Sequence, residues 1–350
     1  MKQKIQIALF IGAMLSGGLQ APLQAATAKK TEQQAVKKTV ASANKNSHTA
    51  KKTLARTASK KSSVKSTGGN GRKAAHAATE SPKKSMRRVN FADVEQGRLA
   101  LHSASVLVID QSTGQTLYEK HSDAVLPIAS ISKLMTAMVV LDAKLDMQEV
   151  ISIGEEEVDS LKGTRSRIPV GMTMTRETAM LLALMSSENR AAHALGRHYP
   201  GGMMAFVKAM NAKAKALGML SSSFEEPTGL SSNNVSTAHD LARMVAAAAR
   251  YPEIRELSTT ASAKVELKGR IKDFNNTNAL VRSDSWEIGI SKTGYISEAG
   301  RCLVMQARVA DKPVVIVLLD STGKMTRVGD ANRIKRWMES ASLASEPGPV

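Results

Sequence analysis

Apolar residues in the middle of the chain recur at intervals of three and four. The run begins just after Pro127, which closes a loop, and it comprises Ile131, Leu134, Met135, Met138, Val139 and Leu141. Such spacing places the residues on one face of a helix. We therefore expect a helix with a buried face here, with Ser130 at its start.

A second helical stretch runs from Thr175 to about Gly196 and is rich in leucine and methionine up to Met185. The polar string Ser-Ser-Glu-Asn at 186–189 interrupts it, and these residue types favour caps and turns over helix interiors. A polar break inside an apolar helix is costly unless the break has a use. A third helix is predicted over 236–249, with Ser236 as its N-cap.

The two ends of the predicted domain are rich in β-formers. Ser105–Asp110 and Gln115–Lys120 flank a turn-forming string, which is the pattern of a hairpin. Three further strands and a closing helix are expected at Trp286–Thr293, Arg301–Ala310, Val314–Asp320 and Asp330 to about Ala344. Strands at both ends with helices between them indicate an α+β domain. Its termini build an antiparallel sheet flanked by helices, and its middle forms a helical insertion.

Residues 1–28 have the pattern of a secretory signal peptide. Two lysines precede an apolar run, Ile5 to Leu15, that is too short to span a bilayer. Small residues follow, and they fit cleavage after Ala25 or Ala28. An uncleaved membrane anchor is the alternative. The shortness of the apolar run and the small residues that follow it favour cleavage and a periplasmic location.

Residues 29–95 differ in character and consist largely of lysine, alanine, serine and threonine. Seventeen basic residues fall between Lys29 and Arg88, against Glu32 and Glu80. Because the formal net charge of the whole chain is +18, most of the basicity belongs to this segment. A segment with so few large apolar residues cannot bury enough surface to offset the entropy of folding, so we expect disorder.

Two interpretations of this basic segment remain open. Its composition is similar to that of lysine-rich chromatin tails, but a secretory signal excludes nucleic acid as the partner. Outside the cytoplasm, a polybasic segment meets anionic envelope surfaces such as lipid, lipopolysaccharide or cell-wall carboxylates. The alternative is a solvated spacer with no specific partner.

The remaining residues, 96–345, are enough for one large catalytic domain. Cys302 is the only cysteine, so an internal disulfide is excluded. It lies in an apolar run, which indicates a buried structural thiol. The seven histidines are scattered, and His193 and His198 do not share a helix face. We therefore expect no metal and no cofactor.

Three short strings carry candidate chemistry. In chain order they are Ser130-Ile131-Ser132-Lys133, Ser187-Glu188-Asn189 and Lys292-Thr293-Gly294. Ser-x-x-Lys and Ser-x-Asn also occur elsewhere in the chain, so the prediction rests on the order, spacing and context of the strings. The first opens an apolar helix and the third ends a strand. Together they supply a nucleophile, an amine base, a second proton-carrying hydroxyl and a strand that holds a peptide.

Ser130 is the candidate nucleophile and Lys133 is its candidate base. A serine hydroxyl needs a base within hydrogen-bond reach, and a lysine three residues along a helix lies on the same side. Burial and a nearby positive charge, here Lys292, both lower the pKa of a lysine and leave it partly neutral. The backbone N–H groups of Ser130 and Tyr295 are the candidate oxyanion donors.

The other two strings predict groups that bind the substrate. Lys292-Thr293-Gly294 ends a strand that an extended peptide joins by backbone pairing. Gly294 leaves room for close approach, and Lys292 and Thr293 are candidates to hold a carboxylate. We expect Ser187 to pass a proton to the leaving amine and Asn189 to bond the substrate amide.

Longer stretches around the strings extend the pattern: Pro127–Thr136, Leu184–Ala192, Tyr199–Gly202, Glu226–Leu230 and Ser291–Gly294. From Ser103 to Glu339 the chain resembles the D-alanyl-D-alanine endopeptidases, which are low-molecular-mass penicillin-binding proteins. The resemblance implies a β-lactamase/transpeptidase-like fold, with Ser130 acylated, Lys133 as base, and Ser187 and Lys292 in the site. It also implies a periplasmic enzyme of cell-wall biogenesis that cleaves cross-links between peptidoglycan stem peptides. β-Lactams are its implied covalent inhibitors.

In relatives a basic residue near the C-terminus often helps hold the substrate carboxylate, and Arg327 is the candidate here.

Three other functions compete with this one. D-alanyl-D-alanine carboxypeptidases trim pentapeptides, but many carry a second β domain and an amphipathic anchor, for which no room remains after Trp337. They also often have Ser-Gly-Asn where this chain has Ser-Glu-Asn. A serine β-lactamase needs a deacylating glutamate in a Glu-x-x-Leu-Asn setting, and Glu226–Leu230 has the wrong spacing and no asparagine. The last alternative is a non-catalytic wall-binding scaffold whose working part is the basic segment.

Overall fold

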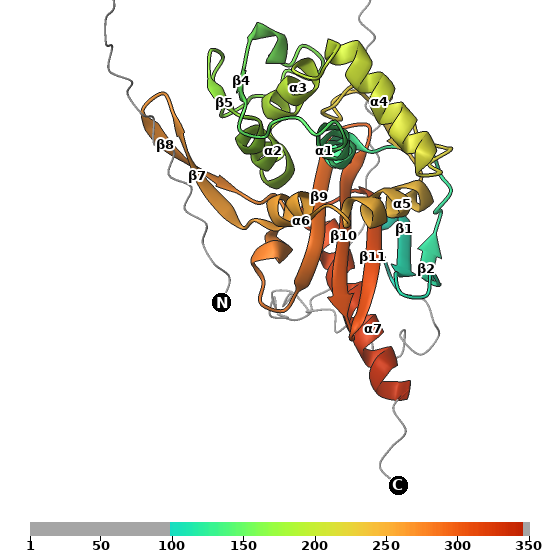
Figure 1. Cartoon of the computed structure of the whole chain (residues 1–350). Helices are drawn as coiled ribbons and strands as arrows, with labels where there is room; N and C mark the ends of the chain where they lie inside the picture. The colour runs from blue at the N-terminus through green and yellow to red at the C-terminus, as the bar shows by residue number, and fades with distance from the viewer. Residues whose placement is uncertain (1–98, 346–350) are drawn as a thin grey trace, which may run out of the picture. The chain divides into compact units, whose positions relative to one another are not determined.

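A computed structural model describes residues 99–345 of the chain. A five-stranded antiparallel sheet lies at its centre, in the order β2-β1-β11-β10-β9 (Figure 1). Its strands are β1 Ser103–Asp110, β2 Thr116–Lys120, β9 Glu287–Ile296, β10 Gly300–Val309 and β11 Lys312–Ser321. The first strand therefore pairs with the last one, and β9 is left at an edge of the sheet.

The two faces of the sheet are covered by different parts of the chain. Side chains alternate across a strand, so Leu303 and Met305 of β10 pack on one face, and Cys302 and Val304 on the other. Helix α7 (Thr326–Ser345) covers the first face, and helices from the middle of the chain cover the second. Both faces are buried over the middle strands, which is why β1, β10 and β11 contain long apolar runs.

Six helices between β2 and β9 form the helical insertion. They are α1 Lys133–Asp142, α2 Arg176–Met185, α3 Asn189–Arg197, α4 Gly202–Ala216, α5 Ala238–Ala248 and α6 Pro252–Thr259. Short 3₁₀ turns lie at η2 Ala129–Ser132, η3 Glu155–Glu157 and η4 Ala279–Arg282. Small two-stranded sheets pair β3 Leu126–Pro127 with β6 Val235–Ser236, β4 Val150–Ser152 with β5 Thr173–Thr175, and β7 Ser262–Leu267 with β8 Arg270–Asn275.

Helix α1 lies among the other helices of the insertion (Figure 1). All of its residues from 133 to 140 are buried, whereas Leu141 is only half-buried. The single buried face predicted from the apolar spacing was therefore too narrow. A helix that is apolar on every side is buried on every side, and α1 places its first residue, Lys133, inside the core.

The remaining predicted elements are confirmed, with one cap corrected. The polar break at 186–189 separates α2 from α3, and the predicted hairpin, strands and closing helix are present. Thr237, not Ser236, caps α5: its hydroxyl accepts from the N–H of Asp240 at 3.2 Å. Ser236 instead belongs to β6, and its hydroxyl bonds that of Ser222. Helices α4 and α6 and the β7–β8 hairpin were not predicted.

The predicted signal peptide at 1–28 and the basic segment at 29–95 lie outside the described residues. Across 99–345, the structure contains no helix that is both long and apolar enough to cross a membrane. Cys302 is fully buried, as predicted, and burial raises the pKa of its thiol to about 11. This thiol is therefore protonated at neutral pH.

Candidate active site

Ser130 lies in η2, the tight turn between β3 and α1. The preceding residue, Ala129, has a φ of 49°, which is uncommon for a residue with a side chain. Lys133 follows one turn later, and its Nζ lies 2.8 Å from Ser130 Oγ. The predicted nucleophile and base are thus within hydrogen-bond distance.

Burial controls the charge of Lys133, whose side chain is inside the core. Burial lowers the pKa of this amine to about 7, although the negative charges of Glu226 and Glu188 partly offset the effect. The repulsion expected between the two lysines acts on Lys292, whose pKa is lowered by the charge of Lys133. Near neutral pH, Lys133 is therefore able both to take up and to release a proton.

The partners of Lys133 direct its lone pair. Nζ lies 2.8 Å from Asn189 Oδ1 and 2.6 Å from the backbone oxygen of Thr228. A neutral amine has two N–H donors and one lone pair. Both of these oxygens are acceptors only, so they take the two N–H groups, and the lone pair is left for the hydroxyl of Ser130. This is the arrangement that a general base needs.

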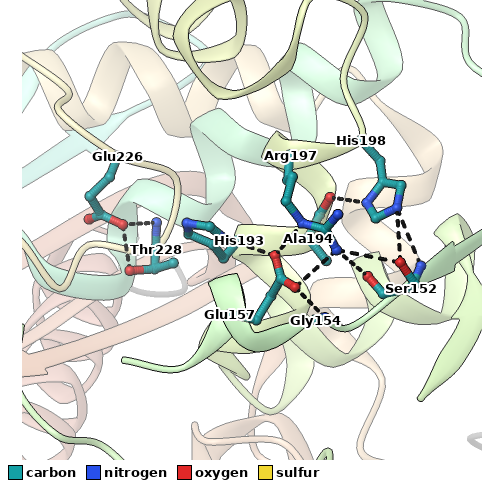
Figure 2. A network of polar contacts seen from close by, with 9 residues as sticks. All are labelled: Ser152, Gly154, Glu157, His193, Ala194, Arg197, His198, Glu226 and Thr228. Carbon is teal, nitrogen blue, oxygen red and sulfur yellow. Dashed lines mark hydrogen bonds and ion pairs between the residues drawn. The ribbon is translucent and has the colours of Figure 1, made fainter. Parts of the chain in front are cut away.

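A loop at 226–230 packs against the backbone of the nucleophile. Gly229 has a φ of 80°, and a Cβ at this position would lie 1.9 Å from the carbonyl oxygen of Ala129. No side chain fits there. The carboxylate of Glu226 accepts the N–H groups of Thr228 and Gly229, each at 2.6 Å, as Figure 2 shows for Thr228. Glu226 therefore shapes the loop that presents the Thr228 carbonyl to Lys133.

Ser187 lies in the polar break between α2 and α3 and has a φ of 61°. Its Oγ accepts a hydrogen bond from Lys292 Nζ at 2.9 Å, and the same amine donates to the backbone oxygen of Thr293. Burial, followed by the charges of Lys133 and Arg327, lowers the pKa of Lys292 well below its usual value. Since Ser187 accepts from Lys292, its own proton is available for donation into the cleft.

Asn189 is the first residue of α3, and a polar cluster around the buried Glu157 contacts later residues of this helix (Figure 2). The carboxylate of Glu157, on η3, accepts from His193 Nδ1 at 2.9 Å and from Arg197 Nε at 2.8 Å. Burial alone would raise the pKa of Glu157, but hydrogen bonds from His193, Arg197 and the Gly154 N–H lower it to about 2. The ionised Glu157 thus fixes the helix that carries Asn189.

The histidines of this region serve structural contacts. His193 bonds Glu157, and His198 Nδ1 donates to the carbonyl of Ala194 at 3.0 Å (Figure 2). In the described part of the chain, no three His, Cys, Asp or Glu side chains are grouped to hold a metal ion.

The end of β9 runs alongside the nucleophile. A Cβ on Gly294 would come within 2.8 Å of the carbonyl oxygen of Ile128 and 3.1 Å of the nitrogen of Ser130. Only a residue without a side chain allows this approach, as predicted. Tyr295 follows, and its ring lies 4.4 Å from the guanidinium of Arg301. The strand therefore brings the backbone of 294–295 next to that of Ser130, where two oxyanion donors were expected.

The β9 side of the cleft carries hydrogen-bond donors, including the guanidinium of Arg327 and the amine of Lys292. Thr293 Oγ1 donates to Thr277 Oγ1 at 2.6 Å. Arg327, near the start of α7, donates through Nη1 to backbone oxygens of β9 and β10 at 2.9 and 3.1 Å. Together with Lys292, these groups suit a ligand that carries a carboxylate.

These residues line one open cleft with a volume of about 250 Å³. Its lining consists of Ser130, Thr164, Ser187, Asn189, Leu230, Thr277, Thr293, Gly294, Tyr295 and Arg327. All nine predicted site residues therefore come together: seven line the cleft, and Lys133 and Lys292 lie behind it. Thr164 and Thr277 were not predicted, because their loops carry no motif. Thr228 was also missed as a functional residue, since a backbone carbonyl leaves no side-chain signal.

Comparison with known proteins agrees with this geometry. Residues 91–323 match the family model described as D-alanyl-D-alanine carboxypeptidase, peptidase S11. The chain is 50% identical over 249 residues to a D-alanyl-D-alanine endopeptidase of Pseudomonas aeruginosa, across 71% of this chain and 80% of the relative. It is 47% identical over 247 residues to the D-alanyl-D-alanine endopeptidase of Escherichia coli, across 70% and 80%. The solved structure of a Streptomyces DD-transpeptidase superimposes with a TM-score of 0.64 at 27% identity, over 70% of this chain and 98% of that one.

The matched range contains every predicted site residue except Arg327. The structural neighbour has the β-lactamase/transpeptidase-like fold that the sequence predicted. The predictions of family and fold are therefore confirmed. The chain belongs to the D-alanyl-D-alanine carboxypeptidase family, a family of serine DD-peptidases with a penicillin-binding fold.

Proposed function

We propose that this protein is a serine DD-endopeptidase that cleaves D-alanyl cross-links between peptidoglycan stem peptides through an acyl-enzyme on Ser130. β-Lactams inhibit it by acylating the same serine. The 2.8 Å contact between Lys133 Nζ and Ser130 Oγ carries this proposal, because it pairs a nucleophile with an amine whose pKa is about 7. The relatives at 50% and 47% identity, both named endopeptidases, support the choice within the family.

Acylation begins when Ser130 Oγ attacks the carbonyl carbon of the cross-linking D-alanine. Lys133 takes the hydroxyl proton, the C–O bond forms, and the oxyanion lies between the N–H groups of Ser130 and Tyr295. The C–N bond then breaks. Ser187 passes its proton to the departing amine and regains one from Lys133, so that the proton taken from Ser130 is balanced by the one gained by the leaving group and Lys133 is neutral again.

Deacylation reverses these roles with water as the nucleophile. Lys133 takes a proton from water, whose oxygen attacks the acyl carbon, and then returns a proton to Ser130 Oγ as the ester bond breaks. The free edge of β9 pairs with the extended peptide, and Asn189 bonds its amide. Lys292, Thr293 and Arg327 bind the carboxylate.

The protein acts in the periplasm under this proposal, after export by the signal peptide predicted at 1–28. Peptidoglycan lies outside the cytoplasmic membrane, which supports export. The basic segment at 29–95 then meets anionic envelope surfaces, and nucleic acid is not its partner.

Chromatography of muropeptides tests the proposal. The mature protein is incubated separately with a 4→3 cross-linked dimer and with a pentapeptide monomer. We expect the dimer to become monomers while the pentapeptide stays intact. Loss of only the terminal D-alanine would instead assign the carboxypeptidase activity in the family's description. If neither substrate is turned over, and Ser130→Ala restores wall phenotypes as well as the wild type, the protein is a scaffold.

A further inference from the structure

The amide of Asn189 has to face Lys133 with its oxygen for the base to work as described. Asn189 Oδ1 lies 2.8 Å from Lys133 Nζ. If the amide were turned over, its NH₂ group would donate to the lone pair of Lys133 and compete with the hydroxyl of Ser130. The amide orientation therefore decides where this lone pair points.

Thr164 fixes that orientation from the other side. Asn189 Nδ2 donates to Thr164 Oγ1 at 3.1 Å. The Thr164 hydroxyl has a single proton, and it donates this proton to Asp159 Oδ2 at 2.6 Å. Because a carboxylate only accepts, Thr164 Oγ1 is left as an acceptor toward Asn189. A chain of hydrogen bonds thus runs from Asp159 through Thr164 and Asn189 to Lys133. The carboxylate at its start determines which group is the donor in each bond.

Asp159 also builds the turn that places Thr164. Its carboxylate accepts the N–H groups of Leu161 and Lys162, at 2.8 and 2.9 Å, and that of Thr164 at 2.8 Å. Partial burial alone would raise the pKa of Asp159, but the hydrogen bonds from the Thr164 hydroxyl and from these N–H groups lower it. Asp159 is therefore ionised at neutral pH.

Contacts on both sides hold the loop at 159–167 against the cleft. Glu188, which is 6% exposed, accepts from Ser166 Oγ and Arg167 Nε, each at 2.7 Å. On the outer side, Lys162 forms an ion pair with Glu298 in the turn between β9 and β10. The loop is thereby tied to α3 and to the sheet, and Thr164 is held where Asn189 meets it.

We propose that Thr164, with its hydroxyl directed by Asp159, is a positioning residue for the acylation of Ser130. It holds the Asn189 amide with its oxygen toward Lys133, which keeps the lone pair of the base on the nucleophile. The amide nitrogen keeps its second N–H for the substrate carbonyl. This inference rests on the proposed function, in which Ser130 is the nucleophile and Lys133 the base.

Thr164→Val tests it, because valine keeps the shape of threonine but accepts no hydrogen bond. The measurement is the second-order rate constant for acylation by a fluorescent penicillin between pH 5 and 9. We expect the plateau rate to fall about fivefold to tenfold, the rate equivalent of one hydrogen bond. We also expect the midpoint of the pH profile to move to lower pH, because a reversed amide disfavours the charged lysine. Thr164→Ser should restore both the rate and the midpoint.

Thr173→Val, at an exposed threonine of β5 outside the cleft, is the matched control. It should acylate like the wild type. Wild-type kinetics in Thr164→Val would overturn the proposal, as would an equal loss in Thr164→Ser with an unchanged midpoint. If the wild type itself were not acylated at Ser130, the proposed function would fail, which is a distinct result.

Discussion

Two buried lysines stand behind the two hydroxyls of the cleft, and their surroundings differ. Lys133 has three oxygen partners, and the charges of Glu226 and Glu188 favour its protonated form. Lys292 has two oxygen partners, and the positive charges of Lys133 and Arg327 oppose its protonation. The same residue type at the same depth therefore meets opposite electrostatic environments.

This difference assigns the two lysines different tasks. The neighbours of Lys133 keep its pKa near neutrality, where an amine exchanges protons readily. Lys292 has its pKa lowered well below the usual value in the free protein, and an entering carboxylate raises it again. We therefore expect Lys133 to act in proton transfer and Lys292 to act in binding. The predictions below test this division, from the largest expected effect to the smallest.

Replacing Lys133 should have the largest effect. Methionine fills the same apolar space without a base, so Lys133→Met should fold but lose roughly 10³–10⁴-fold in acylation rate, the upper range for a general base. Stopped-flow fluorescence with a labelled penicillin measures the rate. A variant within tenfold of the wild type would show that Lys133 is not the base.

The matched change Lys292→Met should lower the acylation rate by a smaller factor, and this factor should depend on the ligand. We expect a loss of about tenfold to a hundredfold for a penicillin with a free carboxylate, the size of one charge-assisted interaction. The methyl ester of the same penicillin should lose much less. If acid and ester lose equally, Lys292 serves the chemistry through Ser187 and not carboxylate binding.

The acylation rate should depend on pH through Lys133. Its pKa of about 7 makes it half neutral at that pH, and only the neutral amine accepts a proton. The rate should therefore be flat above about pH 8 and fall about tenfold for each pH unit well below 7. A profile with no change between pH 5 and 8 would contradict this assignment.

Glu188→Gln should have the smallest effect. Glutamine keeps one acceptor oxygen but loses the charge that pairs with Arg167, whose side chain is 44% exposed. A partly exposed ion pair contributes up to about 1 kcal/mol, so we expect a decrease in melting temperature of roughly 2–4 °C. Because the charge of Glu188 raises the pKa of Lys133, its removal should also move the midpoint of the acylation pH profile to lower pH. An unchanged melting temperature would show that the Glu188 contact does not hold the loop, and an unchanged midpoint would show that its charge does not act on Lys133.

Much of this site was predictable because its side chains lie in short local strings. Ser130 and Lys133 are one helical turn apart, so sequence spacing alone predicts their contact. The order of the strings predicted that Ser187 and Lys292 join them, although 105 positions separate this pair. Strand patterns predicted the sheet because apolar residues on both faces mark buried strands.

The parts that escaped prediction depend on long-range contacts or on the backbone. The Thr228 carbonyl meets Lys133 across 95 positions and carries no residue-specific signal. Thr164 and Asp159 form an ordinary turn, whose value appears only when the fold places it beside Asn189. The N-cap of α5 was assigned one residue too early, since serine is the better capping type of the neighbouring Ser236 and Thr237 and sequence alone does not show that Ser236 is taken up by β6.

The account's central claim is that Ser130 is acylated, and mass spectrometry of the protein after reaction with a penicillin tests it most directly. We predict one covalent adduct, which peptide mapping assigns to the segment that contains Ser130. The adduct should be absent from Ser130→Ala and strongly reduced in Lys133→Met. An adduct that maps to Ser187, or one that persists in Ser130→Ala, would contradict the account.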